Sequence, residues 1–255
     1  MPRLPRLKLP NTPLHIIQRG NNRSVCFGSD EDCLFYLDHL ADISAKMGVA
    51  VHAYVLMTNH VHLLATPQDA EGVSQLMKRL GQRYVQHFNR AYRRTGTLWE
   101  GRFRSCVVGE EKYFLGCHRY IELNPMRAGL VAHPAEYRWS SYGVNAQGNG
   151  HPLIRPHTVY LGLGQSDAER QVAYRALFRH ELDPGLADEI RRVTHGGLVL
   201  GSERFAKEVA LLTGRRTQRG KAGRPFKQSV ETEHADSCLP AQPHSCAMPF
   251  PLTLP

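Results

Sequence analysis

The segment from Val49 to Pro67 places the strongest constraint on what this chain can fold into. It begins with an extended run, rich in β-branched and aromatic residues, that lasts to Met57, and apolar residues alternate along the chain after Thr58-Asn59. Two such runs separated by a tight turn predict a β-hairpin. Because a hairpin pairs antiparallel strands, at least part of the sheet must be antiparallel.

Further periodic segments flank this hairpin. Strands are predicted at 14–18 and 103–108, and helices at 30–47, 73–92 and 110–123. The last helix must end or kink at Pro125, since proline cannot continue regular helical geometry. The order of strand, helix, strand, strand, helix, strand and helix predicts an α+β fold, in which helices cover a mainly antiparallel sheet.

The composition changes after residue 145, where a first domain of residues 1–145 is predicted to end. Residues 146–164 contain glycine and proline and are interpreted as a connector. A small helical module is then predicted over 165–213, with auxiliary DNA binding as its expected role. Its helical patterns lie at 168–180, 186–193 and 202–212. The link between the last two is longer than the turn of about 3–4 residues found in a helix-turn-helix.

The charge balance favours a polyanionic partner. The chain has 32 Lys and Arg against 23 Asp and Glu, which gives a formal net charge of +9. Such an excess attracts nucleic acid over long range and releases its counterions on binding. No run approaches the roughly 18 apolar residues of a membrane span, and no secretory signal is evident at the start. We therefore expect a cytoplasmic protein with no membrane partner and with reduced cysteines.

Two histidines mark the start of the second hairpin strand. His60 and His62 lie two residues apart in the sequence Asn59-His60-Val61-His62-Leu63. A strand directs alternate side chains to the same face, so both imidazoles should project together. Two imidazoles on one face can jointly hold a divalent cation. The alternative is that they are half-buried polar residues without a ligand.

A tyrosine and an asparagine share one face at the end of the helix 110–123. Tyr120 and Asn124 are separated by four residues, which is one helical turn. A phenol can attack a phosphodiester when a base, a cation or an oriented water activates it, and an amide oxygen can be a hard metal ligand. The alternative is that Tyr120 packs in the core and that Asn124 only ends the helix before Pro125.

Taken together, these motifs resemble those of a known family. His60-Val61-His62 resembles the His-hydrophobic-His signature of the HUH nucleases. With its flanking motifs the chain is similar to the REP-associated tyrosine transposases, the bacterial single-tyrosine branch of these enzymes. The flanking motifs are Met57-Thr58-Asn59, Leu98-Trp99-Glu100-Gly101-Arg102-Phe103 and the long block from Arg119 to Val131. The resemblance covers residues 10–145.

The resemblance implies a fold, a reaction and a substrate. The fold would be a ferredoxin-like antiparallel sheet. His60, His62 and Asn124 would hold Mg²⁺ or Mn²⁺, and Tyr120 would attack single-stranded DNA that carries hairpins. The attack would leave a 5′-phosphotyrosine link and a free 3′-OH. The REP-associated branch also implies a monomer. The alternative for this chain is a homodimer, because related transposases of the shorter mobile kind exchange the tyrosine helix between protomers.

Three features depart from, or compete with, the family pattern. Thr58 stands where the family usually has proline, and Met126 stands where valine is common. Both are turn or packing positions, so neither bears on the chemistry. Tyr113, two turns earlier on the same helix as Tyr120, is a rival nucleophile, but it has no asparagine four residues later.

Basic residues gather in three places and are candidates for phosphate contacts. The long helix and its end carry Arg79, Arg83, Arg90, Arg93 and Arg94; the next strand and helix carry Arg102, Arg104 and Arg127; a basic arm carries Arg215, Arg216, Arg219, Lys221 and Arg224. The alternative is a solvated charged surface. Trp99 and Phe103 could stack on bases or lie in the core, and the core is favoured for Phe103. Residues 214–255 consist of this basic arm and, after Lys227, of a polar, proline-rich tail that is predicted to be disordered.

The sequence thus supports a metal-dependent, tyrosine-dependent DNA endonuclease and strand transferase, that is, a transposase. One alternative is a non-catalytic DNA-binding protein or autoregulator derived from such an enzyme. A second alternative is a metal-dependent hydrolase of small phosphoesters, although such an enzyme would have little use for so basic a helix and arm.

Overall fold

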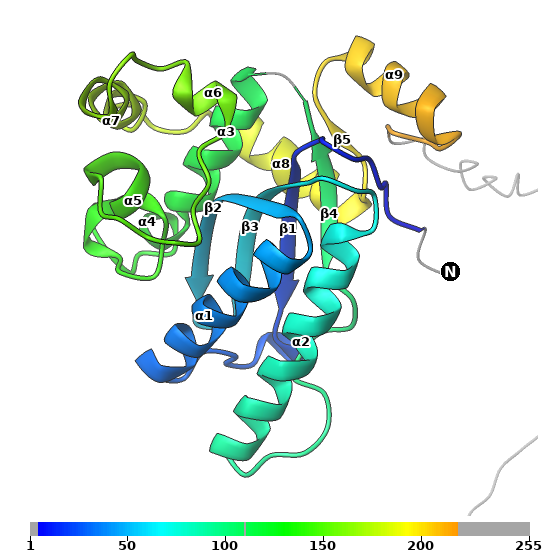
Figure 1. Cartoon of the computed structure of the whole chain (residues 1–255), viewed down its shortest axis with the longest axis vertical. Helices are drawn as coiled ribbons and strands as arrows, with labels where there is room; N and C mark the ends of the chain where they lie inside the picture. Colours follow the sequence, from blue (N-terminus) through cyan, green and yellow to red (C-terminus); the bar gives the residue numbers. More distant parts are fainter. Residues whose placement is uncertain (1–4, 110, 219–255) are drawn as a thin grey trace, which may run out of the picture. The chain divides into compact units, whose positions relative to one another are not determined.

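A five-stranded sheet in the order β2-β3-β1-β4-β5 lies at the centre of the fold (Figure 1). The structure is a computed structural model, and it describes residues 5–109 and 111–218. The strands are β1 (Leu14–Arg19), β2 (Val49–Met57), β3 (His60–Pro67), β4 (Arg104–Val108) and β5 (Val199–Leu200). The pairs β2-β3, β3-β1 and β1-β4 are antiparallel, and β5 pairs with β4 in parallel. The first four strands therefore have the ferredoxin-like order, as expected.

Helices cover this sheet on both faces. The α-helices of the described residues are α1 (Asp30–Lys46), α2 (Gly72–Ala91), α3 (Glu111–Glu122), α4 (Asn124–Arg127), α5 (Tyr142–Gln147), α6 (Thr158–Leu161), α7 (Asp167–Ala176), α8 (Pro184–Gly196) and α9 (Glu203–Thr213). Ser29 starts α1 with a capping box, because its hydroxyl accepts from the backbone N–H of Asp32 and the Asp32 carboxylate accepts from the backbone N–H of Ser29. Each α-helix and strand predicted up to residue 123 is present, with ends that differ by one or two residues.

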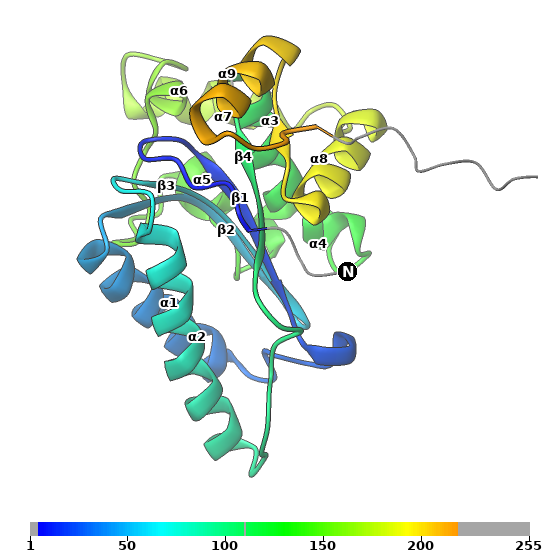
Figure 2. The same ribbon diagram turned by 90° about the vertical axis from the view of Figure 1, so that its right-hand side faces the viewer.

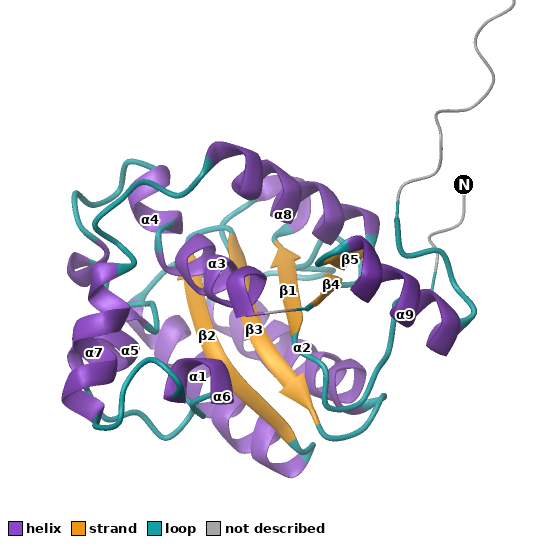
Figure 3. Cartoon of the chain, turned by 90° about the horizontal axis from the view of Figure 1, so that it is seen from above, coloured by secondary structure: helices purple, strands orange, loops and turns teal. Residues whose placement is uncertain are grey.

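The side chains of β3 divide between the two faces of the sheet. Val61, Leu63 and Ala65 pack in the core beneath α1 and α2, whereas Leu64 packs in a second core beneath α3 and α8. Figure 2 shows α1 and α2 on one side of the sheet and α3 and α8 on the other. In Figure 3, α3 lies over β2 and β3, and α8 lies beside β1 and β4. His62 shares the face of Leu64, so its side chain projects toward α3 and α8.

The C-terminal helices are more closely joined to the sheet than a separate module would be. Ile190 and Val193 of α8 pack in the same core as Cys106 and Val108 of β4. Between α8 and α9 the chain forms β5, which a sequence pattern cannot reveal because the strand is only two residues long. A strand therefore stands where a helix-turn-helix would have its turn. The domain boundaries at residues 145 and 165 stay predictions.

Two expectations from composition concern the part of the chain that the structure describes. No helix within it is both long and apolar enough to cross a membrane. Its four cysteines are buried and free, namely Cys26, Cys33, Cys106 and Cys117.

A buried carboxyl group ties α3 to the helices that follow it. Glu122 has no exposed surface. Its carboxylate accepts hydrogen bonds from the Ser141 hydroxyl at 2.6 Å, the Asn145 amide at 2.9 Å and the Tyr174 hydroxyl at 2.8 Å. Burial raises the pKa of Glu122 to about 7, although the three donors oppose that shift. The group is therefore on the border of ionisation at neutral pH.

Replacement of Glu122 by glutamine should change how stability depends on pH. Because folding raises the pKa of Glu122, the free energy of unfolding of the wild type is highest below the unfolded pKa of 4.5 and falls as the pH rises through about 7. The difference between the folded and the unfolded pKa corresponds to about 3 kcal/mol. The glutamine variant does not titrate here, so its stability relative to the wild type should increase by up to that amount between about pH 5 and pH 8. Urea unfolding of both proteins across this range measures it. The buried histidines titrate in both proteins and cancel, so parallel curves would contradict the prediction.

Candidate active site

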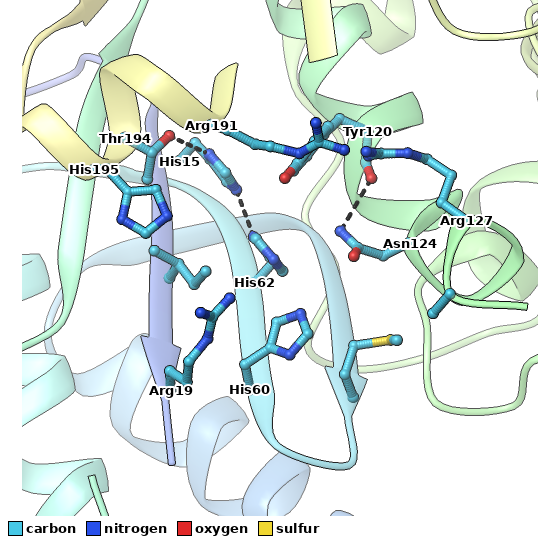
Figure 4. A pocket seen from close by; sticks show the side chains of 13 residues that line it. His15, Arg19, His60, His62, Tyr120, Asn124, Arg127, Arg191, Thr194 and His195 are labelled. Atoms are coloured by element: carbon cyan, nitrogen blue, oxygen red, sulfur yellow. Dashed lines mark hydrogen bonds between the residues drawn. The ribbon is translucent and has the colours of Figure 1, made fainter. Parts of the chain in front are cut away.

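A cavity of about 250 Å³ opens on the face of the sheet that α3 and α8 cover (Figure 4). Side chains from four parts of the chain line it. They are His15 and Arg19 of β1, His60 and His62 of β3, Tyr120 and Asn124 at the junction of α3 and α4, and Arg191, Thr194 and His195 of α8. The structure therefore brings together the four residues that the sequence singles out for chemistry, although their roles stay predictions.

The pairing of β1 with β3 places the histidines. In the antiparallel register Ile17 lies opposite His62 and Arg19 lies opposite His60. Residues directly opposite each other share a face, and diagonal neighbours two residues apart are within reach of large side chains. His15 is the diagonal neighbour of His62, and the two rings stack with their centroids 5.0 Å apart.

His60 is held in one orientation by the residue before it. Its Nδ1 atom lies 2.6 Å from Oδ1 of Asn59, and the Asn59 amide nitrogen donates to the carbonyl oxygen of Arg23 at 3.3 Å. Because an amide oxygen can only accept, Nδ1 of His60 carries the proton and Nε2 keeps its lone pair. Burial, assisted by the positive charge of Arg19, lowers the pKa of His60 to about 4. The ring is therefore neutral at pH 7, as a metal ligand must be.

His62 is the more deeply buried histidine of the pair. Only 3% of its surface is exposed, and its Nδ1 atom lies 2.8 Å from Nε2 of His15. Burial also holds the pKa of His62 well below its usual value, and it lowers that of His15 to about 3. Both rings are therefore neutral at pH 7, and a single proton lies between them.

Tyr120 lies against these rings and is surrounded by two arginines. Its ring centroid is 5.6 Å from that of His62 in an edge-to-face contact, and the guanidinium of Arg127 lies over the ring at 4.9 Å. The side chain of Arg191 of α8 interacts with the phenol. Burial raises the pKa of Tyr120 above its usual value, while Arg191 opposes that shift because it stabilises the phenolate.

Asn124 completes a donor set that fits a divalent cation. Its amide nitrogen donates to the carbonyl oxygen of Tyr120 at 3.3 Å, which turns Oδ1 away from that carbonyl (Figure 4). The side chain also interacts with His60. With the His60 proton on Nδ1 and directed to Asn59, the lone pair of Nε2 and that of Asn124 Oδ1 are both available to a divalent cation. Among residues 5–109 and 111–218 no three His, Cys, Asp or Glu side chains form a metal cluster, so the candidate donors are two imidazoles and one amide.

Three of the predicted phosphate contacts lie beside this cavity. Arg127 lines it, and Arg102 and Arg104 line an adjoining hollow together with Arg19. Arg104 donates from Nη1 to Nδ1 of His195 at 2.6 Å. Arginine has no acceptor, so His195 carries its proton on Nε2.

The arginines of the long helix lie elsewhere. Because α2 packs beneath the opposite face of the sheet, its basic surface faces away from the cavity. Arg79, Arg83, Arg90 and Arg93 are exposed, and Arg94 lies over the ring of Phe88 at 5.5 Å. Sequence periodicity placed these residues on one helix surface but could not tell which face of the sheet that helix covers.

The basic arm is described only at its start. Arg215 donates to the backbone carbonyl of Arg6 at 2.7 Å, and Arg216 is exposed. Arg219, Lys221 and Arg224 lie outside the described residues. Their expected contacts with DNA therefore stay predictions.

Three aromatic residues that were open to a functional role lie outside the cavity. Trp99 and Phe103 are 5% and 8% exposed and belong to the core beneath α1 and α2, so neither offers a face to a base. Core packing, the alternative favoured for Phe103 and left open for Trp99, is therefore the role that burial supports for both rings. Tyr113 packs partly buried against the other core and is not among the cavity residues.

The sequence reasoning missed five polar residues of the cavity. His15 and Arg19 could have been found, because they share a strand face with each other at even spacing. Arg191, Thr194 and His195 share a helix face at spacings of three and four residues. Nothing in their segment indicates which part of the fold that face meets.

Comparison with known proteins gives a match to a family model and matches to solved structures, among them the following two. The family model described as "Transposase IS200 like" matches residues 8–124. A solved REP-associated tyrosine transposase bound to a REP hairpin matches with 16% identity and a TM-score of 0.48, over 62% of this chain and 93% of that one. A candidate transposase from Deinococcus radiodurans R1 matches with 25% identity and a TM-score of 0.34, over 43% and 88%. No curated protein matches.

Removal of the Arg191 charge should make Tyr120 harder to ionise. In an Arg191→Gln variant the phenolate loses its cationic partner while the ring stays buried, so the pKa of Tyr120 should rise further. An NMR titration of protein with ¹³C-labelled tyrosine follows that ionisation. Arg192→Gln is the matched control, since Arg192 lies next on α8 and pairs with Glu189 instead. An equal pKa in both variants would show that Arg191 does not act on the phenol.

Proposed function

Because residues 8–124 belong to the IS200-like transposase family, we propose that this chain is a metal-dependent endonuclease and strand transferase for single-stranded DNA. One observation carries the proposal: Tyr120, His60, His62 and Asn124 line a single cavity although they come from two separate parts of the fold. The motif resemblance between residues 57 and 131 supports the REP-associated branch of the family. It also supports a DNA substrate that carries hairpins from repetitive extragenic sequences.

Tyr120 is the proposed nucleophile. Its phenolic oxygen attacks the phosphorus of a DNA phosphodiester, and the 3′-oxygen on the opposite side leaves. One P–O bond forms and one breaks, and the phenolic proton ends on the 3′-oxygen. The products are a 5′-phosphotyrosine link and a free 3′-OH, and the bond energy is retained so that the step can be reversed to join strands. Arg191 assists because its positive charge beside the phenol favours the phenolate.

His60, His62 and Asn124 are the proposed holders of Mg²⁺ or Mn²⁺. Such a cation supplies charge that polarises the phosphoryl oxygen and stabilises the leaving oxygen. The contribution of the chain is the orientation of its donors. Asn59 turns Nε2 of His60 inward, and the Tyr120 carbonyl turns Oδ1 of Asn124 toward it.

Arg19 is the best placed residue to bind the phosphate itself. Its Nε atom is buried and has no hydrogen-bond partner within the described structure, although the side chain reaches the cavity beside His60 (Figure 4). A buried donor without a partner is costly, and a phosphate oxygen would satisfy it. Arg102 and Arg104 in the adjoining hollow would hold the neighbouring phosphates, since they continue the same positive surface. The arginines of α2 would then contact only DNA that passes around the edge of the sheet.

The assembly and location of the protein follow from the same reasoning. Every residue of the proposed site comes from one chain, which supports a monomer. A DNA substrate and the absence of a membrane-spanning helix from residues 5–109 and 111–218 are compatible with the cytoplasm as the place of action.

Substitution of Tyr120 should abolish the covalent product. Wild-type protein incubated with end-labelled hairpin DNA and Mg²⁺ or Mn²⁺ should give a protein–DNA adduct on a denaturing gel, and Tyr120→Phe should give none because the attacking oxygen is absent. Tyr113→Phe lies on the same helix and should retain the adduct. Cleavage by Tyr120→Phe at the wild-type rate would overturn the assignment of the nucleophile. DNA binding by the wild type without any cleavage would favour the non-catalytic alternative.

Truncation after Gln218 tests the basic arm. The cut preserves Thr217, whose hydroxyl donates to the carbonyl of Ala206 and whose carbonyl accepts from the N–H of Val199. If the removed residues Arg219, Lys221 and Arg224 bind phosphates, DNA affinity should fall, and the slope of log affinity against log salt should flatten by roughly one for each phosphate that the arm no longer neutralises. Fluorescence anisotropy at several salt concentrations measures both. An unchanged slope would show that the arm does not bind DNA.

A further inference from the structure

A chain of hydrogen bonds runs from α8 through β1 to His62. The Thr194 hydroxyl donates to the backbone carbonyl of Ile190 at 2.6 Å. Nδ1 of His15 lies 2.9 Å from the Thr194 oxygen, and Nε2 of His15 lies 2.8 Å from Nδ1 of His62. All three side chains are at most 3% exposed, so water does not compete for these bonds.

The donor and the acceptor of each hydrogen bond in this series follow from the Ile190 carbonyl at its end. A carbonyl oxygen can only accept a hydrogen bond, so the Thr194 hydroxyl uses its one proton to donate to the carbonyl oxygen of Ile190. The hydroxyl oxygen then accepts from Nδ1–H of His15. Because a neutral imidazole carries a single proton, Nε2 of His15 is an acceptor, and Nδ1 of His62 must be the donor. Nε2 of His62 is therefore left with its lone pair.

The reverse order of protons is unfavourable here. If Nε2 of His15 donated to His62, its Nδ1 would need a proton from Thr194. The Thr194 and Ile190 oxygens would then lie 2.6 Å apart with no hydrogen between them. His62 would carry its proton on Nε2, which is the nitrogen that faces away from His15. This order would therefore break one hydrogen bond and leave two oxygen atoms repelling each other among buried side chains.

We propose that Thr194 and His15 are positioning residues that fix His62 as the tautomer with its proton on Nδ1, so that Nε2 can bind the metal ion. This deepens the proposed function, because it rests on His62 as a metal ligand. His60 reaches the same tautomer by a separate route through Asn59. The tautomers of the two histidines are thus fixed independently. Asn59 in the preceding turn fixes that of His60, and Thr194 of α8 fixes that of His62 through His15.

The arrangement gives α8 a chemical role in addition to its packing. Arg191 and Thr194 lie one turn apart on that helix, and the first reaches the phenol while the second starts the chain to His62. Both lie beyond the segment that matches the transposase family, which ends at Asn124. The segment that matches the family therefore supplies the reacting groups. Helix α8 affects two of them, through the ionisation of Tyr120 and the tautomer of His62.

The tautomer can be read directly in the metal-free full-length protein. Protonated and unprotonated imidazole nitrogens differ widely in ¹⁵N chemical shift, and a ¹⁵N-histidine spectrum in which the His62 signals are assigned by their loss in His62→Asn resolves both. We expect a protonated Nδ1 and an unprotonated Nε2. A proton on Nε2 of His62 would overturn the inference. Because the measurement needs neither metal nor DNA, its outcome is independent of whether the protein cleaves DNA.

Metal affinity provides the second readout. Loss of an outer hydrogen-bond partner of a ligand typically lowers metal affinity about 10–100-fold, so Thr194→Val should weaken Mn²⁺ binding at least about 10-fold as measured by electron paramagnetic resonance of free Mn²⁺. Thr194→Ser keeps the hydroxyl and should restore affinity to within about twofold. Cys106→Ala is the matched control, since Cys106 contacts the same hydroxyl at 3.2 Å but is not part of the chain of bonds.

The two readouts separate the possible failures. Equal Mn²⁺ affinity in the folded Thr194→Val variant and in the wild type would overturn the positioning role, even if the wild type cleaves DNA. If the wild type binds no Mn²⁺, the proposed function fails on its metal, whereas the ¹⁵N spectrum still decides the tautomer. Thermal unfolding of each variant confirms that the protein measured is folded, and the serine variant excludes a general effect of substitution at this position.

Discussion

The antiparallel register of β1 against β3 is the constraint on which the candidate site depends. It sets Ile17 opposite His62 and Arg19 opposite His60, and it brings His15 within hydrogen-bond distance of His62. Side chains alternate along a strand, so a one-residue shift of β3 would turn His60 and His62 toward α1 and α2, and a one-residue shift of β1 would do the same to His15 and Arg19. Such a shift would also move a fully buried residue, Leu63 of β3 or Ile16 of β1, to the other face. The burial of apolar residues on one face of the sheet therefore fixes which side chains line the cavity on the other face.

Helix α3, which carries Tyr120, is held in place by contacts on more than one of its sides. Its side toward the sheet packs in the core with Ile121, while Glu122 points into a polar cluster made with α5 and α7. Adjacent positions on one helix thus hold three unlike environments, namely apolar packing, a buried carboxyl group and the cavity. A helix fixed at so many points around its axis cannot rotate, so the phenol and the Asn124 amide keep their positions relative to the strands.

Much of this arrangement could be predicted from the sequence, and the reason differs from element to element. The hairpin and the long amphipathic helix follow from local periodicity, which reports burial directly. His60, His62, Tyr120 and Asn124 could be selected because their spacing within one strand or one helix already defines a shared face. Residues that meet across the fold could not be selected in this way. Thr194 carries no chemical signal of its own, and its contact with His15 depends on how α8 docks against β1 and β4. Whether Trp99 stacks on bases or lies in the core could not be decided from the sequence for a related reason, since an aromatic residue in a loop has no periodicity that reveals its burial.

The docking of α8 also bears on how proteins with this architecture can diverge. A change in the segment 184–196 would ordinarily be counted as a change in an accessory part, because the transposase match ends at Asn124. Here that segment contributes one wall of the cavity, so a recombination event that exchanged the C-terminal half would also replace part of the candidate site. The segment that builds the candidate site is therefore longer than the segment that matches the family model.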